Sequence, residues 1–255
     1  VTVPQDQTVE ESGEQSVPLT GITAGPDNEL EDLRITYTLD DTISIAFARG
    51  DHMVGETLTI RGVTFTYINA ATTTPGLNDI AVNAQDPTQT IAVKTATAIN
   101  DRLVETVAVA SNNTITVAAA DNPTASSTDR FAMMTAASIV SGLEVVYNPL
   151  DTTWQFLYTP DTENFGQVTV TLNTLDAGVD GIFGTTDDLA IDRTFSITVA
   201  PLNDEPTLDA IASVDLNEDD PEQTVDLAGI TPRPSNELED LRVTYRLGGT
   251  TSVAF

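Results

Sequence analysis

The chain has 255 residues, room for about two domains, and its hydrophobic fraction of 40% is enough for packed cores. Ten Lys and Arg residues against 39 Asp and Glu residues give a formal net charge of -29. Such a charge repels nucleic-acid phosphates and anionic lipid surfaces, so we expect neither as a partner. Cysteine is absent, which excludes disulfides, thiolate catalysis and zinc–thiolate sites. No run of about 18 apolar residues occurs, so we expect no membrane insertion in this segment.

An internal repeat is the strongest pattern in the chain. Residues 14–47 read EQSVPLTGITAGPDNELEDLRITYTLDDTISIAF, and residues 222–255 read EQTVDLAGITPRPSNELEDLRVTYRLGGTTSVAF. The two copies align without a gap at a spacing of 208 residues. Each carries apolar residues that alternate with polar ones, which predicts strands with one buried face. The alternating positions are Leu33, Ile35, Tyr37 and Leu39, then Ile43, Ile45 and Phe47, and in the second copy Leu241, Val243, Tyr245 and Leu247, then Val253 and Phe255.

The pattern of predicted secondary structure changes between residues 48 and 142. Residues 55–68 read as a β-hairpin that turns at Arg61-Gly62, and residues 107–118 read as a second hairpin. Between them, Thr88 to Leu103 places apolar residues on one helical face, after a start signal at Asp86-Pro87. This β-β-α-β-β order predicts a small α+β domain inserted at 48–142, in a loop of the surrounding domain.

Strand patterns resume after the insertion. Trp154, Phe156 and Tyr158 alternate before a turn at Pro160-Asp161, and further alternations centre on Val170 and Ile197. Residues 1–47 and about 143–200 together supply roughly seven short strands, the number expected of an immunoglobulin-like sandwich. We therefore predict a mainly β fold, with one discontinuous sandwich formed by residues 1–47 and 143–203. Residues 204–255 are predicted to be a linker and the first half of the next repeat, completed by a continuing chain or by another copy.

Two stretches resemble a known family. The string ITVAPLNDEPTLDAIASVDLNEDDPEQTVDLAGI looks like the junction between tandem cadherin-like or bacterial Ig-like repeats of giant cell-surface proteins, and FLYTPDTENFGQVTVTL is similar to their paired strands. The linker, Leu202 to Pro206, departs from the full D-x-N-D-N pattern of cadherins, and a D-R-E motif is missing. Within the insertion, GETLTIRGVTFT resembles small modules of flagellins and phage surface proteins. The resemblance implies Ig-like or cadherin-like sandwiches in a tandem array.

The segment DAGVDGIFGTTDD is the best candidate for a metal site. Four carboxylates, spaced by glycines that permit positive-φ turns, can surround one cation, and hard oxygen ligands suit Ca²⁺. A plain acidic hairpin loop is the alternative interpretation. The predicted ligands are Asp176, Asp180, Asp187 and Asp188.

The junction between the repeats is the second candidate. A calcium ion that bridges acidic groups there would fix the angle between neighbouring repeats and stiffen the array, although an acidic linker can also simply keep the chain soluble. The predicted ligands are Asn203, Asp204 and Glu205 in the linker, Glu218 and Asp219 at the start of the next repeat, and Glu10 and Glu11 in the first one.

Catalytic combinations are scarce in this sequence. His52 is the one histidine and Lys94 the one lysine, so a nucleophile–base pair has few possible members. The tripeptide Arg49-Gly50-Asp51 matches an integrin motif, but three-residue matches are common by chance. We expect no enzyme.

These patterns predict a structural or adhesive repeat module of an extracellular bacterial surface protein or fibre, stiffened by calcium. Its expected partners are neighbouring repeats or other copies of itself. The alternatives are a module that binds a surface glycan or protein through the insertion, and an accessory region of a secreted enzyme.

Overall fold

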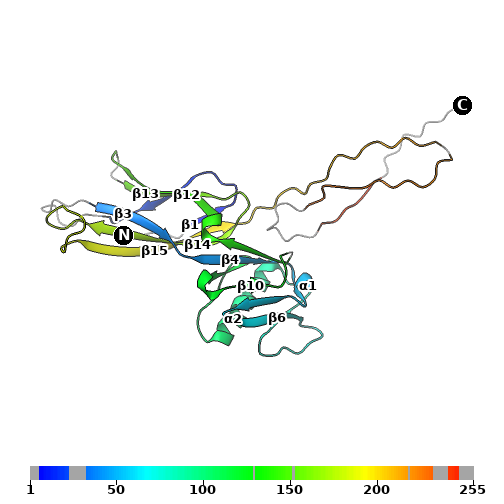
Figure 1. Cartoon of the computed structure of the whole chain (residues 1–255), viewed down its shortest axis with the longest axis horizontal. Helices are drawn as coiled ribbons and strands as arrows, with labels where there is room; N and C mark the ends of the chain where they lie inside the picture. The colour runs from blue at the N-terminus through cyan, green and yellow to red at the C-terminus, as the bar shows by residue number, and fades with distance from the viewer. Residues whose placement is uncertain are drawn as a thin grey trace.

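Four sheets dominate the computed structural model of the chain (Figure 1), which describes residues 6–22, 33–128, 130–150, 153–217, 219–231 and 241–246. The fold is mainly β, as the sequence predicts. Within the described ranges, no helix combines the length and the apolar character needed to cross a membrane.

Two of the sheets face each other across one core. The first has the order β1-β15-β14-β3 and the second β12-β13-β2. Every pair in these sheets is antiparallel except β1 with β15, which is parallel. The strands are β1 (Asp6–Val9), β2 (Gln15–Leu19), β3 (Leu33–Leu39), β12 (Val140–Asn148), β13 (Thr153–Pro160), β14 (Gly166–Asp176) and β15 (Leu189–Ala200).

Period-two alternation produces this core. On β14 every second side chain is buried, among them Val168, Val170 and Leu172. They pack with Phe156 of β13 and Phe195 of β15, whose rings meet edge to face at 5.5 Å between centroids. The predicted strands at Trp154–Tyr158, Val168–Leu172 and Phe195–Val199 are therefore confirmed.

Strand β4 (Thr42–Phe47) and the segment between it and β12 form the other two sheets, of order β10-β5-β6-β7 and β11-β4-β9-β8. Both predicted hairpins and the predicted helix are confirmed, and Arg61 turns the first hairpin at φ 51°. The strands β7, β10 and β11 were not predicted, so the order β-β-α-β-β is incomplete. The elements are α1 (Gly50–Met53), β5 (Thr57–Ile60), β6 (Val63–Asn69), β7 (Asp79–Val82), α2 (Thr88–Leu103), β8 (Val109–Ser111), β9 (Thr114–Ala118), a 3-10 turn (Ala119–Asp121), β10 (Thr124–Ala125), β11 (Phe131–Thr135) and α3 (Ala136–Ile139).

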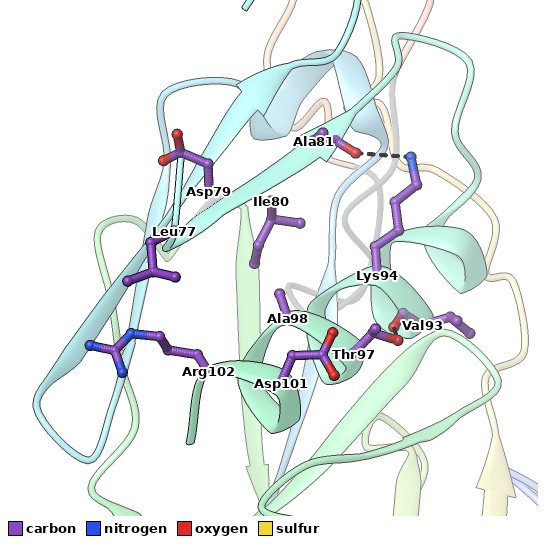
Figure 2. A pocket seen from close by; sticks show the side chains of 10 residues that line it. All are labelled: Leu77, Asp79, Ile80, Ala81, Val93, Lys94, Thr97, Ala98, Asp101 and Arg102. Atoms are coloured by element: carbon purple, nitrogen blue, oxygen red, sulfur yellow. Dashed lines mark hydrogen bonds between the residues drawn. The ribbon is translucent and has the colours of Figure 1, made fainter. Parts of the chain in front are cut away.

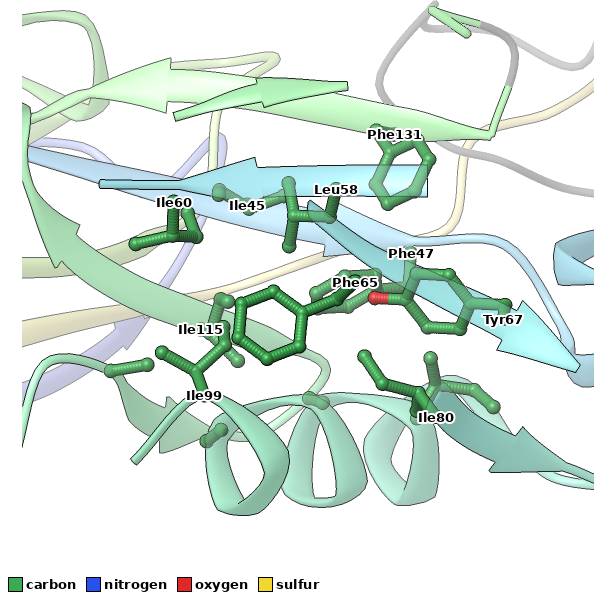
Figure 3. Close-up of a cluster of buried hydrophobic side chains, with 14 of the residues drawn as sticks. Ile45, Phe47, Leu58, Ile60, Phe65, Tyr67, Ile80, Ile99, Ile115 and Phe131 are labelled. Carbon is green, nitrogen blue, oxygen red and sulfur yellow. The ribbon is translucent and has the colours of Figure 1, made fainter. Parts of the chain in front are cut away.

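Helix α2 closes a second core, shown in Figure 3. It begins after Pro87, whose fixed φ suits a helix start, and ends where Val104 turns left-handed at φ 57°. Its apolar face, with Ile91 and Ile99, packs beneath the aromatic side chains Phe47, Phe65, Tyr67 and Phe131. A buried hydrogen bond of 2.9 Å joins the Tyr67 hydroxyl to Thr95 Oγ1, and burial raises the pKa of Tyr67 well above its usual range.

Strand β4 belongs to both cores. It pairs with β9 and β11, and its side chains Ile45 and Phe47 point into the α2 core, whereas Ala46 packs in the two-sheet core. The sequence pattern predicts one buried face at Ile43, Ile45 and Phe47. That prediction is wrong for β4, because small residues at Ser44 and Ala46 let it pack on both sides. The domain boundary at residue 47 stays a prediction, but the strand that precedes this boundary pairs with strands that follow it.

The backbone that follows β15 extends away from the two sheets over a long distance (Figure 1). A bridge joins Thr207 to Thr231, and a hydrogen bond of 2.9 Å joins Asp209 N to the Ala228 carbonyl. Residues 241–246 form neither helix nor strand. The strand predicted from Leu241, Val243 and Tyr245 is therefore not formed, and Leu247, Val253 and Phe255 lie outside the described residues.

Candidate functional site

The acidic loop connects the longest hairpin of the molecule. β14 and β15 pair from Gly166↔Val199 to Asp176↔Leu189, and the loop closes the far end of this ladder (Figure 1). Its glycines have the predicted left-handed backbone, with φ 64° at Gly178, 66° at Gly181 and 96° at Gly184. These turns fold a short loop back on itself, so that carboxylates far apart in the loop can meet.

Three of the four predicted ligands gather at one hydroxyl. Thr185 Oγ1 lies 2.7 Å from Asp187 Oδ1, 3.0 Å from Asp188 Oδ1 and 3.5 Å from Asp180 Oδ1. It also lies 3.1 Å from the Ile182 carbonyl oxygen. A hydroxyl has a single proton to donate, so Thr185 can satisfy only one of these oxygens at a time, while Ile182 N donates to Asp180 Oδ1 at 2.9 Å. Such an arrangement attracts a cation.

Three further carboxylate oxygens of the loop accept hydrogen bonds from backbone N–H groups. Gly178 N donates to Asp176 Oδ1 at 2.7 Å, Val179 N to Asp187 Oδ2 at 3.0 Å and Gly184 N to Asp188 Oδ2 at 2.6 Å. The hydrogen bond from Thr185, followed by backbone hydrogen bonding, holds the pKa of Asp187 below its usual range. Asp176 is bonded at the loop entrance, apart from the three carboxylates at Thr185.

The loop has the types of oxygen donor that calcium prefers, but its carboxylates are too far apart to hold an ion together. Three carboxylates, a hydroxyl and a backbone carbonyl form a set of hard oxygen donors of the kind Ca²⁺ prefers. Among the described residues, however, no three His, Cys, Asp or Glu side chains are grouped closely enough to hold a metal. To hold the ion, Asp180, Asp187 and Asp188 would have to move inward from their N–H partners.

Arg34 fixes the loop to the neighbouring strand. Its guanidinium carbon lies 4.1 Å from the centre of the Phe183 ring, a cation–π contact between β3 and the loop. Neither Arg34 nor Thr185 is among the residues predicted for this site. The loop sequence G-T-T-D-D offered Thr185 as a further oxygen donor, whereas the partner of Phe183 is 149 positions away in the sequence and left no local signal.

The second candidate site lies where the end of β1 meets the end of β15. Glu10 is buried, and its Oε1 accepts a 2.6 Å hydrogen bond from Leu202 N. The backbone N–H of Glu11, at φ 61°, donates to the Asp161 carbonyl at 3.2 Å. Asp161, between β13 and β14, is thus brought to the junction, although the sequence analysis did not assign it there.

The other predicted junction residues are less closely joined. Asn203 Nδ2 donates to the Asp204 carbonyl at 3.1 Å, and Glu205 is exposed. Asp219 is exposed in a turn closed by the 2.7 Å bond from Asn217 N to Asp220 Oδ2. Glu218 lies outside the described residues.

A groove separates α2 from β7, the edge strand of its sheet (Figure 2). Its volume is about 460 Å³, and Leu77, Ile80, Val93 and Ala98 contribute apolar surface. Lys94 Nζ donates to the Ala81 carbonyl at 2.9 Å and forms an ion pair of 2.5 Å with Asp86. Asp79, Asp101 and Arg102 also line the groove, so its charges are mixed and favour no ligand of one sign.

The Arg49-Gly50-Asp51 tripeptide is built into the fold. Gly50 is buried at the start of α1, and its N–H donates to the Asp86 carbonyl at 3.2 Å. Arg49 Nε and Asp51 Oδ1 lie 4.0 Å apart. The tripeptide is therefore the start of α1, with Gly50 packed against residue Asp86.

Comparison with family models, with curated proteins and with solved structures gave no match. The fold and the sites define a mainly β, acidic protein with two cores that share strand β4 and an acidic loop at the tip of its longest hairpin. The resemblance to cadherin-like and bacterial Ig-like repeats stays a prediction.

Proposed function

We propose that this chain is a structural or adhesive repeat module of an extracellular bacterial surface protein or fibre. The observation that carries the proposal is the repeated turn. Gly21 has φ 70° and Gly229, its counterpart 208 residues later, has φ 68°. Two copies of one sequence therefore adopt the same left-handed backbone at the same position, as expected of successive units in an array.

Strand order supports an Ig-like or cadherin-like sandwich. Seven-stranded sandwiches of this type join their second, fifth and fourth strands in one sheet and their third, sixth and seventh in the other. If β4 and the elements up to α3 are set aside, β2, β13 and β12 take the first set of places, and β3, β14 and β15 take the second. The first strand departs from the immunoglobulin constant pattern, because β1 pairs with β15 instead of joining β2.

Calcium is the proposed stiffening element. Asp180, Asp187 and Asp188 would hold it in the loop, with Thr185 completing the set. At the junction, Glu10, Glu11, Asn203, Asp204 and Glu205 are the proposed ligands on the side of the first unit. In a chain of net charge -29, neutralising these groups relieves repulsion that the folded state otherwise carries.

Thermal unfolding with calcium or with chelator tests this part of the proposal. At a calcium concentration of about 100 times Kd, binding to the folded state contributes about 2.7 kcal/mol, which in a chain of this size raises Tm by roughly 5–10 °C. The double variant Asp180→Asn/Asp188→Asn should lose most of this increase. Asp192→Asn, which changes an exposed carboxylate on β15 bonded to Asn173, is the matched control and should keep it. An unchanged Tm in wild type with calcium would contradict the calcium site.

The groove between α2 and β7 favours one alternative, a module that binds a glycan or protein through the inserted segment. A glycan array probed with the whole chain and with Val93→Asp separates the two functions. Selective binding that Val93→Asp abolishes would favour the binding module. Absence of selective binding is expected for the structural module.

A further inference from the structure

The second copy of the repeat leaves exposed the residues that the first copy buries. On β2, Val17 is 1% exposed and Leu19 is 4% exposed. Their counterparts 208 residues later, Val225 and Leu227, are 45% and 46% exposed. The same side chains in the same local sequence are therefore buried by neighbouring strands in the first copy and exposed in the second.

The same contrast holds for the strand that follows. Tyr37 of β3 is 37% exposed; its hydroxyl donates to the Leu143 carbonyl at 3.0 Å, and its ring meets Phe156 edge to face at 5.5 Å. Its counterpart Tyr245 is 87% exposed, and the neighbouring Val243 is also exposed. A row of exposed apolar side chains on an extended backbone is a surface that needs a partner.

The first copy identifies that partner by its register. β13 covers β2 through the pairs Phe156↔Val17 and Trp154↔Leu19. β14 covers β3 through Leu172↔Tyr37 and Thr174↔Ile35. Moved by 208 residues, these pairs put Phe156 and Trp154 of a second unit opposite Val225 and Leu227, and Leu172 and Thr174 opposite Tyr245 and Val243. Each of the four counterparts is identical except Val243, which is one methylene smaller than Ile35.

The second copy has the same left-handed turn as the first. Gly229 adopts φ 68°, and a Cβ at this position would clash with the Asp209 carboxylate. Thr207 Oγ1 donates to the Gly229 carbonyl at 2.7 Å. The second copy thus has the left-handed turn at Gly229, although the residues that correspond to β2 and β3 do not form strands.

We propose that residues 222–231 and 241–246 are the docking surface for residues 143–200 of a second copy of this unit, joined in tandem, whose β12–β15 strands close a second two-sheet core. The inference rests on the proposed function, since it identifies the contact by which one unit continues into the next. The occupant follows from continuity with the β2–β13 and β3–β14 interfaces of the first unit.

Exchange between separate chains is the less favourable arrangement. The structure describes one β13 and one β14 in each chain, and β2 and β3 of the same chain already cover them. A segment from another chain that displaced them would uncover as much apolar surface as it covers. A second unit in tandem, in contrast, brings a further β13 and β14, which no other strands cover.

An extended chain tests the inference directly. Residues 48–208 are appended after Phe255, so that a second full period is present, and hydrogen exchange is followed by mass spectrometry. Amides of residues 223–227 and 241–245 should exchange at least about 100-fold more slowly in the extended chain than in the original one. Unchanged exchange would overturn the proposal. A calcium-dependent Tm of the original chain is measured separately, so the two proposals can fail independently.

Cysteine pairs test the register, because the chain has no cysteine of its own. Val225→Cys, combined with Phe156→Cys in the appended unit, should form a disulfide. Thr224→Cys with the same partner is the control and should not, since its counterpart Ser16 points to the opposite face of β2. Equal cross-linking of both pairs would overturn the register. Cross-linked dimers of the original chain carrying Val225→Cys and Phe156→Cys would overturn the tandem arrangement in favour of exchange.

Discussion

Gly178 packs directly against Asp187 at the neck of the acidic loop. A Cβ on Gly178 would lie 2.6 Å from Asp187 Oδ2 and 2.8 Å from its carbonyl oxygen. The contact holds one strand of the loop against the other and keeps the Asp187 carboxylate beside Thr185. Glycine is required here twice, by its φ of 64° and by the missing side chain.

Gly178→Ala should therefore weaken calcium binding by about tenfold, because its methyl group displaces Asp187 from the position that its neighbours hold. The left-handed backbone of a non-glycine residue lowers the stability of the fold by about 1–2 kcal/mol besides. Gly184→Ala is the matched control. It has φ 96°, but its Cβ would meet nothing within 4 Å, so the backbone cost remains without the displacement. Calcium titration by calorimetry measures both. Equal affinities for the two variants would show that the close approach to Asp187 has no role.

Thr185 sets the titration of Asp187. Its hydrogen bond, the largest cause, lowers the Asp187 pKa in the folded state. A carboxylate with a depressed folded pKa contributes stability above its ordinary pKa of about 3.9, and the contribution is lost as the pH falls through the folded pKa. Thr185→Val should raise the pKa of Asp187 toward its ordinary value, as followed by NMR titration without calcium. Thr185→Ser keeps the hydroxyl and should leave the pKa low; an equal rise in both variants would assign the shift to another group.

Local patterns predicted most elements of this fold. Helix α2 occupies the predicted residues Thr88–Leu103, and the turns at Arg61-Gly62 and Asn112-Asn113 lie between the predicted strands. The period of apolar residues and the turn chemistry are both readable within about 15 residues of sequence. The predictions succeeded for elements whose apolar periodicity and turn residues lie within the element itself.

The predictions failed where the structure of a segment depends on contacts with residues far away in the sequence. Strand β4 looks half-buried in sequence because Ser44 and Ala46 are small, and long-range packing buries them. Residues 241–246 have the alternation of Leu33–Leu39 but form no strand, since a strand needs a partner across the ladder. In the loop, the spacing of the carboxylates predicted a cluster, but the role of Thr185 depends on how the glycines fold it.

The packing of β4 against the start of β14 gives a third prediction. Gly166 has φ 137°, and a Cβ there would lie 2.6 Å from Ser44 Cβ and 3.2 Å from the end of Ile139. Gly166→Ala should lower the free energy of unfolding by roughly 2 kcal/mol or more, because backbone strain and overpacking add. Gly142→Ala, at φ 61° with its nearest neighbour atom at 3.4 Å, is the control for backbone strain alone. Urea unfolding compares them, and equal losses would contradict a tight contact between β4 and β14.

The α2 core supplies the last prediction, through the buried Tyr67–Thr95 hydrogen bond. Tyr67→Phe leaves the Thr95 hydroxyl buried without this partner, so we expect a loss of about 1–3 kcal/mol. Thr95→Val should cost a similar amount by leaving the Tyr67 hydroxyl unsatisfied. The double variant Tyr67→Phe/Thr95→Val removes both polar groups and should cost clearly less than the sum of the two single changes. Urea unfolding of the four proteins gives the coupling energy; strict additivity would mean that the hydrogen bond between Tyr67 and Thr95 does not stabilise the α2 core.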